Sequence, residues 1–349
     1  MSNKAKNRMK QAVQQILKVV LSLLLGSAIL YWMYRGFDFQ LVKHVMFNEM
    51  NWIWMWLSFP LGILAEAIRG WRWKQSLKPM GEKSRVSVRV HSVLLSYAVS
   101  LLIPRIGEFV RCGVLNRFDN VSFPKALGTV VTERIIDSLL IMLITVITVI
   151  AQIQIFDTFF IHTGTSIDAI LSKFSTMGYI VTAVCGIAVL LLLFFLIKRL
   201  AIYNKVKSTI CDIGKGVESL RYVHNAPLFV FYTLAIWMCY FLHYYLTFFC
   251  FDATAHLGLS CAIVTFIVGS IAVIVPTPNG AGPWHFAVKT MLILYGVADN
   301  DALYFVLIVH SVQTLLVAVL GVYAWIALSF THKKLKRVKL GKIYLPDNY

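Results

Sequence analysis

The chain has 349 residues, of which 58% are hydrophobic and only 14% are Asp, Glu, Lys or Arg. Ordinary soluble domains carry about 25% charged residues, so this composition excludes a soluble globular enzyme and a disordered chain and indicates a polytopic membrane protein. The formal net charge of +17 is typical of a membrane protein with basic cytoplasmic loops, and we expect no nucleic-acid partner. The six cysteines form no Cys-x-x-Cys pair, so we expect no disulfide framework, no metal site and no cofactor.

Six apolar stretches are long enough to cross a membrane, because a bilayer core needs about 20 apolar residues per helix. The predicted spans are Ile16–Tyr34, Trp52–Ile68, Ala126–Ile150, Met177–Ile197, Leu228–Cys250 and Leu303–Phe330. The first ends in aromatic residues without a small-residue cleavage site, so we expect a retained helix and not a signal peptide. Five tryptophans near the ends of the second span are interpreted as interfacial aromatics: Trp52, Trp54, Trp56, Trp71 and Trp73.

Two further apolar regions are interrupted by proline and glycine. In the first, His91–Ile103 stops at Pro104-Arg105-Ile106-Gly107-Glu108, and Phe109–Phe118 follows. In the second, Leu259–Val275 stops at a turn that begins with Pro276 and ends with Pro283, and Trp284–Tyr295 follows. Proline lacks an amide donor and clashes with the preceding turn, so each region predicts two half-helices around a kinked loop. Such a re-entrant hairpin survives at membrane depth only where protein or a water-filled cavity satisfies its polar groups.

The distribution of basic residues predicts the orientation. If both hairpins return to their own side, most Lys and Arg fall on one face, in the loops 69–90, 117–125 and 198–227 and in a basic tail, 331–349. The positive-inside rule then places both termini in the cytoplasm and residues 151–176 outside. A bacterial inner membrane is the expected location.

The order of elements repeats along the chain. Span, span, hairpin, span runs through residues 16–150 and again through 177–330, and the two halves start on opposite sides. This predicts an inverted repeat, in which the broken elements mark a site near the membrane midplane. The predicted fold is therefore an all-α polytopic membrane protein, one integral membrane domain over residues 1–349 with six full spans and two re-entrant helical hairpins.

The first hairpin contains three candidate binding residues, Arg105, Glu108 and Arg111. If the half-helix begins near Gly107, Glu108 lies in its first turn, where the helix dipole favours an anion, and Arg111 lies three residues on. The guanidinium groups and the helix N-terminus could hold a phosphate. The alternatives are a structural ion pair that pins the hairpin and a loop exposed to water.

The following span carries Glu133, Arg134 and Asp137 about two turns from its start. Each ion costs roughly 2.5–3.5 kcal/mol at a helix centre, so the three are expected to face the bundle interior, with Arg105 or Arg111 as partners. They form either a buried structural network or part of a polar pathway. Glu66, three residues before Arg69, is interpreted as half of an interfacial ion pair.

The second hairpin offers a glycine-containing turn and two basic side chains. Gly280 and Gly282 allow positive φ, so free N–H groups of the turn could face an anion. His285 and Lys289 lie four residues apart on the returning half-helix, and His285 is either a proton or head-group ligand or a hydrogen-bonded core residue. The candidate residues of this hairpin are Pro276, Pro278, Gly280, Gly282, His285 and Lys289.

Three motifs in this order resemble the flippase-like, lysylphosphatidylglycerol synthase transmembrane-region family. They are Pro104-Arg105-x-Gly107-Glu108-x-x-Arg111, Glu133-Arg134-x-x-Asp137 and Pro276-x-Pro278-x-Gly280-x-Gly282. The resemblance covers about residues 16–330. It implies a membrane region that moves aminoacylated phospholipid, which a separate C-terminal cytosolic domain makes in the best-known members. The residues after Phe330 are too few for such a domain, so we expect that the chain is not the synthase. Asn279 and His285 replace a glycine and the glutamate of the family's usual turn.

Two functions follow as hypotheses. The first is a lipid translocase whose two hairpins meet around a phosphate-bearing head group of a membrane lipid. The second is a non-catalytic accessory protein for a separately encoded lipid- or glycan-modifying enzyme. An intramembrane transferase would need a nucleophile or metal motif that the sequence does not contain, so we do not expect an enzyme.

Overall fold

The computed structural model describes residues 24, 26–31, 33–35, 39–155, 158, 225–275 and 277–331, and the regular elements within them are helical. The elements of the first part are α2 (Phe39–His44), the π-helix η1 (Val45–Glu49), α3 (Trp52–Leu77), η2 (Lys78–Met80), α4 (Val86–Leu102), α5 (Gly107–Asp119) and α6 (Phe123–Ala151). Those of the second part are α11 (Ala226–Tyr245), η4 (Leu246–Cys250), α12 (Asp252–Ala255), α13 (Leu259–Ala272), η5 (Pro278–Gly280), α14 (Pro283–Leu294) and α15 (Asp299–Ser329).

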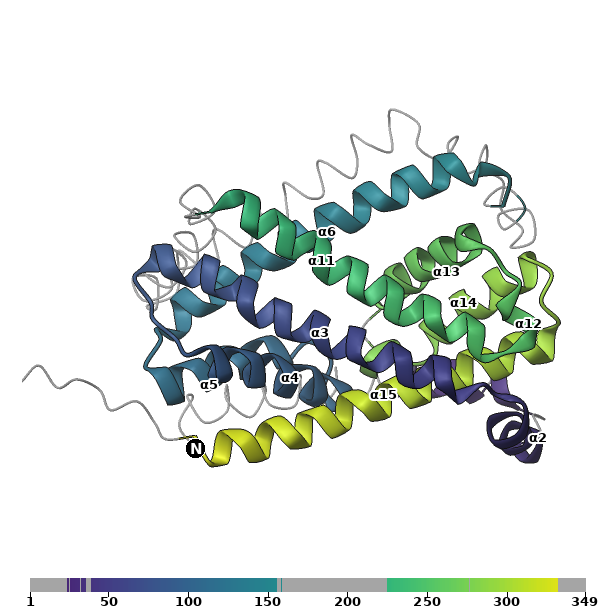
Figure 1. Ribbon diagram of the computed structural model, residues 1–349, viewed down its shortest axis with the longest axis horizontal. Helices are drawn as coiled ribbons and strands as arrows, with labels where there is room; N and C mark the ends of the chain where they lie inside the picture. The colour runs from purple at the N-terminus through teal and green to yellow at the C-terminus, as the bar shows by residue number, and fades with distance from the viewer. Residues whose placement is uncertain are drawn as a thin grey trace, which may run out of the picture.

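Four long helices, α3, α6, α11 and α15, run along the length of the molecule (Figure 1). Within the part of the chain that the structure describes, three segments are long and apolar enough to cross a membrane: Phe123–Ala151, Ala226–Cys250 and Asp299–Ser329. They correspond to three predicted spans. Met177–Ile197 and most of Ile16–Tyr34 lie outside the described residues, as do most of the loops 151–176 and 198–227 and the tail, so the six spans and the inverted repeat stay predictions.

The predicted end of the second span at Ile68 is wrong for the helix, because α3 is 26 residues long and continues beyond Ile68 to Leu77. Arg69 and Arg72 lie within α3 and on its buried face. Both side chains are less than 3% exposed, so they cannot belong to a basic surface loop. An arginine whose charge is paired inside the protein can lie within a buried helix and does not mark its end.

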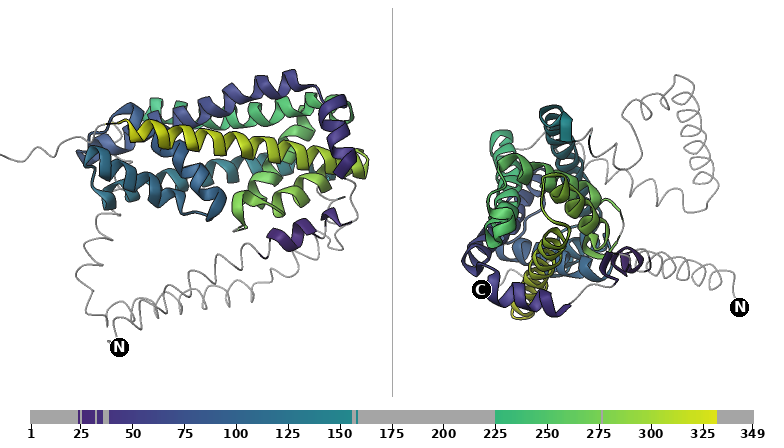
Figure 2. Two further views of the ribbon diagram at one scale, coloured as in Figure 1. Left: turned by 90° about the horizontal axis from the view of Figure 1, so that it is seen from below. Right: turned by 90° about the vertical axis from the view of Figure 1, so that its right-hand side faces the viewer.

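Two helical hairpins enter from opposite ends of the molecule and meet near its middle (Figure 2, left). The first hairpin is α4, residues 103–106 and α5, and the second hairpin is α13, residues 273–282 and α14. Between their tips, Arg105 Nη2 donates a hydrogen bond to the carbonyl oxygen of Ile274 at 2.9 Å. The two breaks that proline and glycine predict are therefore present and in contact.

The two breaks depend on unusual backbone conformations. Arg105 has φ of 65° in the first, and Asn279, Gly280 and Gly282 have φ of 52°, 71° and 92° in the second. Glycine adopts this region without strain, as the sequence predicts for Gly280 and Gly282. Gly107 has a different role, because a Cβ there would collide with the carbonyl oxygen of Ser96. The close approach of α5 to α4 therefore requires glycine.

Two apolar cores hold the helices together. One surrounds Tyr244, Phe248 and Phe305 and joins α11, η4 and α15. The other contains Trp73, Cys112 and Val130 and joins α3, α5 and α6. The second core fixes the helices that carry the charged residues described next.

Candidate functional site

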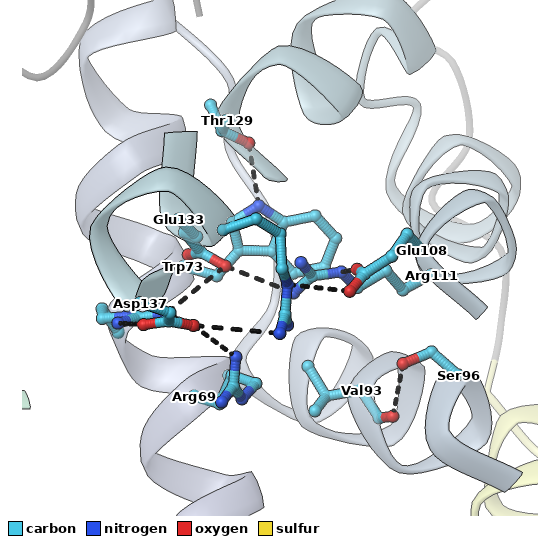
Figure 3. Close-up of polar contacts among 12 residues, drawn as sticks. Arg69, Trp73, Val93, Ser96, Glu108, Arg111, Thr129, Glu133 and Asp137 are labelled. Atoms are coloured by element: carbon cyan, nitrogen blue, oxygen red, sulfur yellow. Dashed lines mark hydrogen bonds and ion pairs between the residues drawn. The ribbon is translucent and has the colours of Figure 1, made fainter. Parts of the chain in front are cut away.

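A buried charge cluster lies where α3, α5 and α6 meet (Figure 3). It comprises Glu66, Arg69, Arg72, Glu108, Arg111, Glu133, Arg134 and Asp137. Four side chains are basic and four are acidic, so the cluster is formally neutral. Only the side chains of Glu108 and Arg134 in this cluster are substantially exposed, at 28% and 38%. The other six are buried, which a low-dielectric interior tolerates because each charge has a partner of opposite sign nearby.

Asp137 is the centre of one half of the cluster. Arg72 donates to both of its carboxylate oxygens, Nη1 to Oδ1 at 2.7 Å and Nη2 to Oδ2 at 3.1 Å. Arg69 Nη1 donates to Oδ2 at 2.9 Å. Arg72 also donates to Thr233 Oγ1 on α11 at 3.0 Å, so this half joins α3, α6 and α11. The bidentate geometry is the strong form of the arginine–carboxylate pair.

Glu108 bridges the other half of the cluster to its exposed edge. Arg111 Nε lies 2.6 Å from Glu108 Oε2, and Arg134 Nε lies 2.8 Å from Glu108 Oε1. Arg111 Nη1 donates to Glu133 Oε2 at 3.3 Å. Below it, the indole of Trp73 lies 4.8 Å from the guanidinium carbon of Arg111. The first turn of α5 therefore holds an acidic residue between two arginines.

The structure confirms part of the predicted pairing and corrects the rest. Glu108 lies in the first turn of α5, and Arg111 pairs with both Glu108 and Glu133, as the spacing predicts. The expected partner of the acidic residues on α6 was Arg105 or Arg111. Arg111 is that partner for Glu133, and among the described residues Arg105 forms no ion pair with them. Its guanidinium donates instead to the carbonyl oxygen of Ile274 on the second hairpin.

The sequence interpretation missed Arg69 and Arg72, which are the main partners of Asp137. The available signal was their spacing, because residues three apart, from Glu66 to Arg69 to Arg72, share one helix face. Glu66 is also buried, and its Oε1 accepts a hydrogen bond from Tyr240 at 2.7 Å. The interpretation of Glu66 and Arg69 as an interfacial pair is therefore wrong.

Trp73 is likewise not an interfacial aromatic. It is fully buried, and its Nε1 donates to Thr129 Oγ1 at 2.9 Å. The indole closes the cluster on the side of α3 and gives Arg111 an aromatic face, an attractive arrangement for a cation.

A groove of about 520 Å³ opens beside the exposed edge of the cluster, between α5 and α6. Arg105, Glu108 and Arg134 contribute the charged part of its wall. The rest is largely apolar and is formed by Phe109, Leu127, Val130, Val131, Ile135, Ser138, Leu139 and Met142. A charged patch within an apolar wall is complementary to an amphipathic molecule.

The second hairpin presents a different set of groups. Its candidates Pro278, Gly280 and Gly282 lie at the tip, and Pro276 lies outside the described residues. The N–H groups of Gly280 and Ala281 bond to carbonyls within the turn, and that of Gly282 bonds to His285 Nδ1 at 3.4 Å. These three N–H groups are therefore not free for an anion, contrary to expectation. Lys289 Nζ pairs with Asp299 at 2.9 Å at the start of α15, away from the tip.

Comparison with known proteins gives one match. The family model described as the lysylphosphatidylglycerol synthase TM region matches residues 16–321. No curated protein and no solved structure matches the chain. The matched segment covers most of the sequence and includes both hairpins and the buried charge cluster. The chain therefore belongs to the lysylphosphatidylglycerol synthase TM-region family and is an integral membrane protein with a role connected to membrane lipid.

Proposed function

We propose that the chain translocates a membrane lipid with a phosphate head group and that the lipid enters through the groove between α5 and α6. The observation that carries this proposal is the combination, in one groove, of a largely apolar wall with Arg105, Glu108 and Arg134. Acyl chains are compatible with the apolar wall, and a phosphate is compatible with the two guanidinium groups. Arginine suits this task because its planar fork matches phosphate oxygens.

The charge balance favours an anionic head group. Arg134 is already paired with Glu108, but no carboxylate among the described residues pairs with Arg105. Arg105 is exposed and bonded to the neutral carbonyl of Ile274. A phosphodiester carries one negative charge, so it would neutralise the cation that the cluster leaves unmatched.

The same bond suggests how binding could affect the hairpins. A phosphate that takes both donors of the Arg105 fork competes with the carbonyl oxygen of Ile274 on the second hairpin. Binding at the groove therefore weakens the contact between the two tips. In transporters with broken elements at the midplane, the substrate site between these elements opens first to one side of the membrane and then to the other.

The test is lipid movement in reconstituted liposomes, measured by chemical reduction of a fluorescent phospholipid in the outer leaflet. We expect Arg105→Gln to abolish movement while the protein remains in the membrane, and Arg105→Lys to restore it in part, because lysine provides a charge without the fork. Arg117→Gln is the matched control, since Arg117 is exposed at the far end of α5 and contributes nothing to the groove. Equal activity of Arg105→Gln and Arg117→Gln would contradict the role of the groove.

An inactive wild-type protein in the same liposomes would favour the second hypothesis, an accessory protein for a separately encoded lipid- or glycan-modifying enzyme. Co-purification from the native membrane then identifies that enzyme. The liposome measurement therefore separates the two functions before any variant is made.

We also propose that the protein lies in a bacterial inner membrane with both hairpins re-entrant and both termini in the cytoplasm. The described end of the molecule that contains η2 is basic, with Lys78, Lys83, Arg85, Arg117 and Lys125. The opposite end carries Glu49, Asp252, Asp299 and Asp301. In a cysteine-free version, we expect an impermeant thiol reagent added outside intact cells to label Asn300→Cys and not Lys83→Cys. The reverse pattern would overturn the orientation.

A further inference from the structure

The tip of the second hairpin borders a separate cavity of about 620 Å³. It is lined by Leu30 and Tyr34, by Leu101 of α4, and by residues of the hairpin tip, α14 and α15, and it contains two neighbouring histidines. The ring centroids of His285 and His310 are 4.4 Å apart. His285 is 3% exposed and is shielded from water, and His310 is partly buried.

The hydrogen-bond partners fix the tautomer of each ring. A carbonyl oxygen only accepts, and His310 Nε2 lies 3.1 Å from the carbonyl oxygen of Asn279, so His310 carries its hydrogen on Nε2. A backbone N–H only donates, and that of Gly282 points to His285 Nδ1, so His285 accepts at Nδ1 and carries its hydrogen on Nε2. The basic atom of His310 is therefore Nδ1, the ring nitrogen that carries no hydrogen in the neutral pair.

We propose that the His285–His310 pair binds a single proton, at His310 Nδ1, and that this proton is the coupling ion of the transport cycle. Protonation at His310 Nδ1 keeps the bond from Nε2 to Asn279, whereas protonation at His285 Nδ1 would replace the bond from Gly282. A second proton is disfavoured because two imidazolium rings at this separation repel each other. Coupling rests on the proposed lipid transport, but proton binding does not.

The surroundings of the pair allow one added charge. Among the described residues that line the cavity, the other titratable side chain is Tyr34 of the first helix, 6.1 Å from the His285 ring between centroids. On α14, Lys289 pairs with Asp299. Arg105 of the first hairpin is the cation that contacts the second hairpin, through the carbonyl oxygen of Ile274. No carboxylate lines the cavity within the described residues, so a proton is not stabilised permanently and can leave.

The proton changes the strength of a bond that holds the tip. Asn279 attaches the turn to α15 twice, through its carbonyl oxygen to His310 and through Nδ2 to Thr314 Oγ1 at 2.6 Å. A charged donor makes a stronger hydrogen bond than a neutral one. Protonation of His310 therefore strengthens the attachment of the second hairpin to α15, and loss of the proton weakens it.

The first measurement is proton binding by the purified full chain, without transport. Trp284 lies against the pair, with its ring centroid 5.1 Å from that of His310 and 5.6 Å from that of His285. Because imidazolium quenches indole fluorescence, we expect the fluorescence to fall on acidification, as the pair takes up its proton. The change should disappear in Trp284→Phe and in His310→Gln, and remain in His44→Gln, which removes an exposed histidine of α2.

His310→Gln keeps a side-chain donor for Asn279, and His285→Gln is the second variant if size exclusion shows that the first does not fold. A fluorescence signal that is independent of pH, or a transition that both histidine variants retain, overturns the site. The second measurement is lipid movement under an imposed pH gradient, which should accelerate wild type and His44→Gln but not the pair variants. If the pair titrates but lipid movement does not depend on the pH gradient, coupling is overturned and the proton site stands. If no lipid movement occurs under any condition, the proposed function is overturned and the proton site stands.

Discussion

The two hairpins reach the same place with different chemistry. The first is held by ion pairs, through Arg111 and Glu108 to α6, whereas the second is held by neutral hydrogen bonds, through Asn279 to His310 and Thr314 on α15. An unpaired ion at membrane depth costs roughly 2.5–3.5 kcal/mol, so the arginines of the first hairpin require carboxylates on neighbouring helices. The tip of the second hairpin carries no such ion, since Lys289 of α14 pairs with Asp299 away from the tip, and the tip is able to gain a charge.

This difference assigns different tasks to the two tips. The buried charge cluster is closed and neutral, and it fixes the position of α5 against α3 and α6. Buried ion pairs are weak evidence for stability, but breaking one leaves an uncompensated charge, which is strongly unfavourable. The first hairpin is therefore the fixed side of the contact between the tips, and the second hairpin is the side that responds to protonation.

The largest expected effect breaks the first hairpin itself. Gly107→Ala places a methyl group against the carbonyl oxygen of Ser96, which is backbone and cannot rotate away. We expect loss of folded protein, measured as the monodisperse peak in fluorescence-detected size exclusion. Gly113→Ala is the matched control in the same helix, because a Cβ there meets nothing within 4 Å. Normal yield of both variants would show that α5 does not approach α4 as closely as described.

The next effect concerns the buried charges. Asp137→Asn leaves Arg69 and Arg72 without their shared carboxylate, and we expect a loss of about 3–5 kcal/mol in thermal or denaturant unfolding. Adding Arg72→Gln should recover part of this loss, because it removes one orphaned charge. Adding Arg134→Gln instead should recover less, since Arg134 lies 3.8 Å from Asp137 and pairs with Glu108.

An exposed pair is the reference for this experiment. Asp299 pairs with Lys289, but its side chain is 64% exposed, so Asp299→Asn should change the unfolding free energy by less than about 1 kcal/mol. Equal effects of Asp137→Asn and Asp299→Asn would mean that water reaches the cluster.

The same contrast shows how far the sequence could predict the site. Proline and glycine predict both breaks, and the need to pair Glu133 and Asp137 predicts that arginines come to them. The identity of those arginines was not predictable from hydropathy alone, because Arg69 and Arg72 follow an apolar run and look like the start of a basic loop. Their burial depends on the packing of α3 against α6, a long-range contact that no local pattern contains.

The second hairpin was predicted less well for a related reason. The sequence indicates positive φ at Gly280 and Gly282, and the structure agrees. It does not indicate that His285 accepts from Gly282 or that His310, far along the chain, faces it. The direction of Lys289 likewise depends on the position of Asp299 at the start of α15, which is set by the packing of the hairpin.

A smaller effect concerns the hydrogen bond between Trp73 and Thr129 next to the buried charge cluster. Thr129→Val removes the acceptor of Trp73 Nε1 in a fully buried position, and we expect a loss of about 1–3 kcal/mol, because a buried donor is left unsatisfied. Thr145→Val in the same helix is the control. Its hydroxyl bonds within α6 to the carbonyl oxygen of Ile141, and that carbonyl keeps its place in the helix. A difference near zero between the two variants would mean that Trp73 needs no partner.

The smallest effect compares the two non-glycine residues that hold a left-handed backbone at the hairpin tips. Arg105 and Asn279 have φ of 65° and 52°, a region that costs roughly 1–2 kcal/mol for most residues and less for asparagine. In Arg105→Gly the relief of strain offsets the lost bond to Ile274, so we expect unchanged thermal stability together with loss of lipid movement. In Asn279→Gly the relief is smaller and the bond to Thr314 is lost, so a slightly lower melting temperature is expected. A clear loss of stability in Arg105→Gly, with movement retained, would instead make Arg105 a structural link between the hairpins. Glycine would adopt the backbone conformation of Arg105 without strain, so stability alone gives no reason for an arginine at this position. A binding role for the guanidinium explains why an arginine is there.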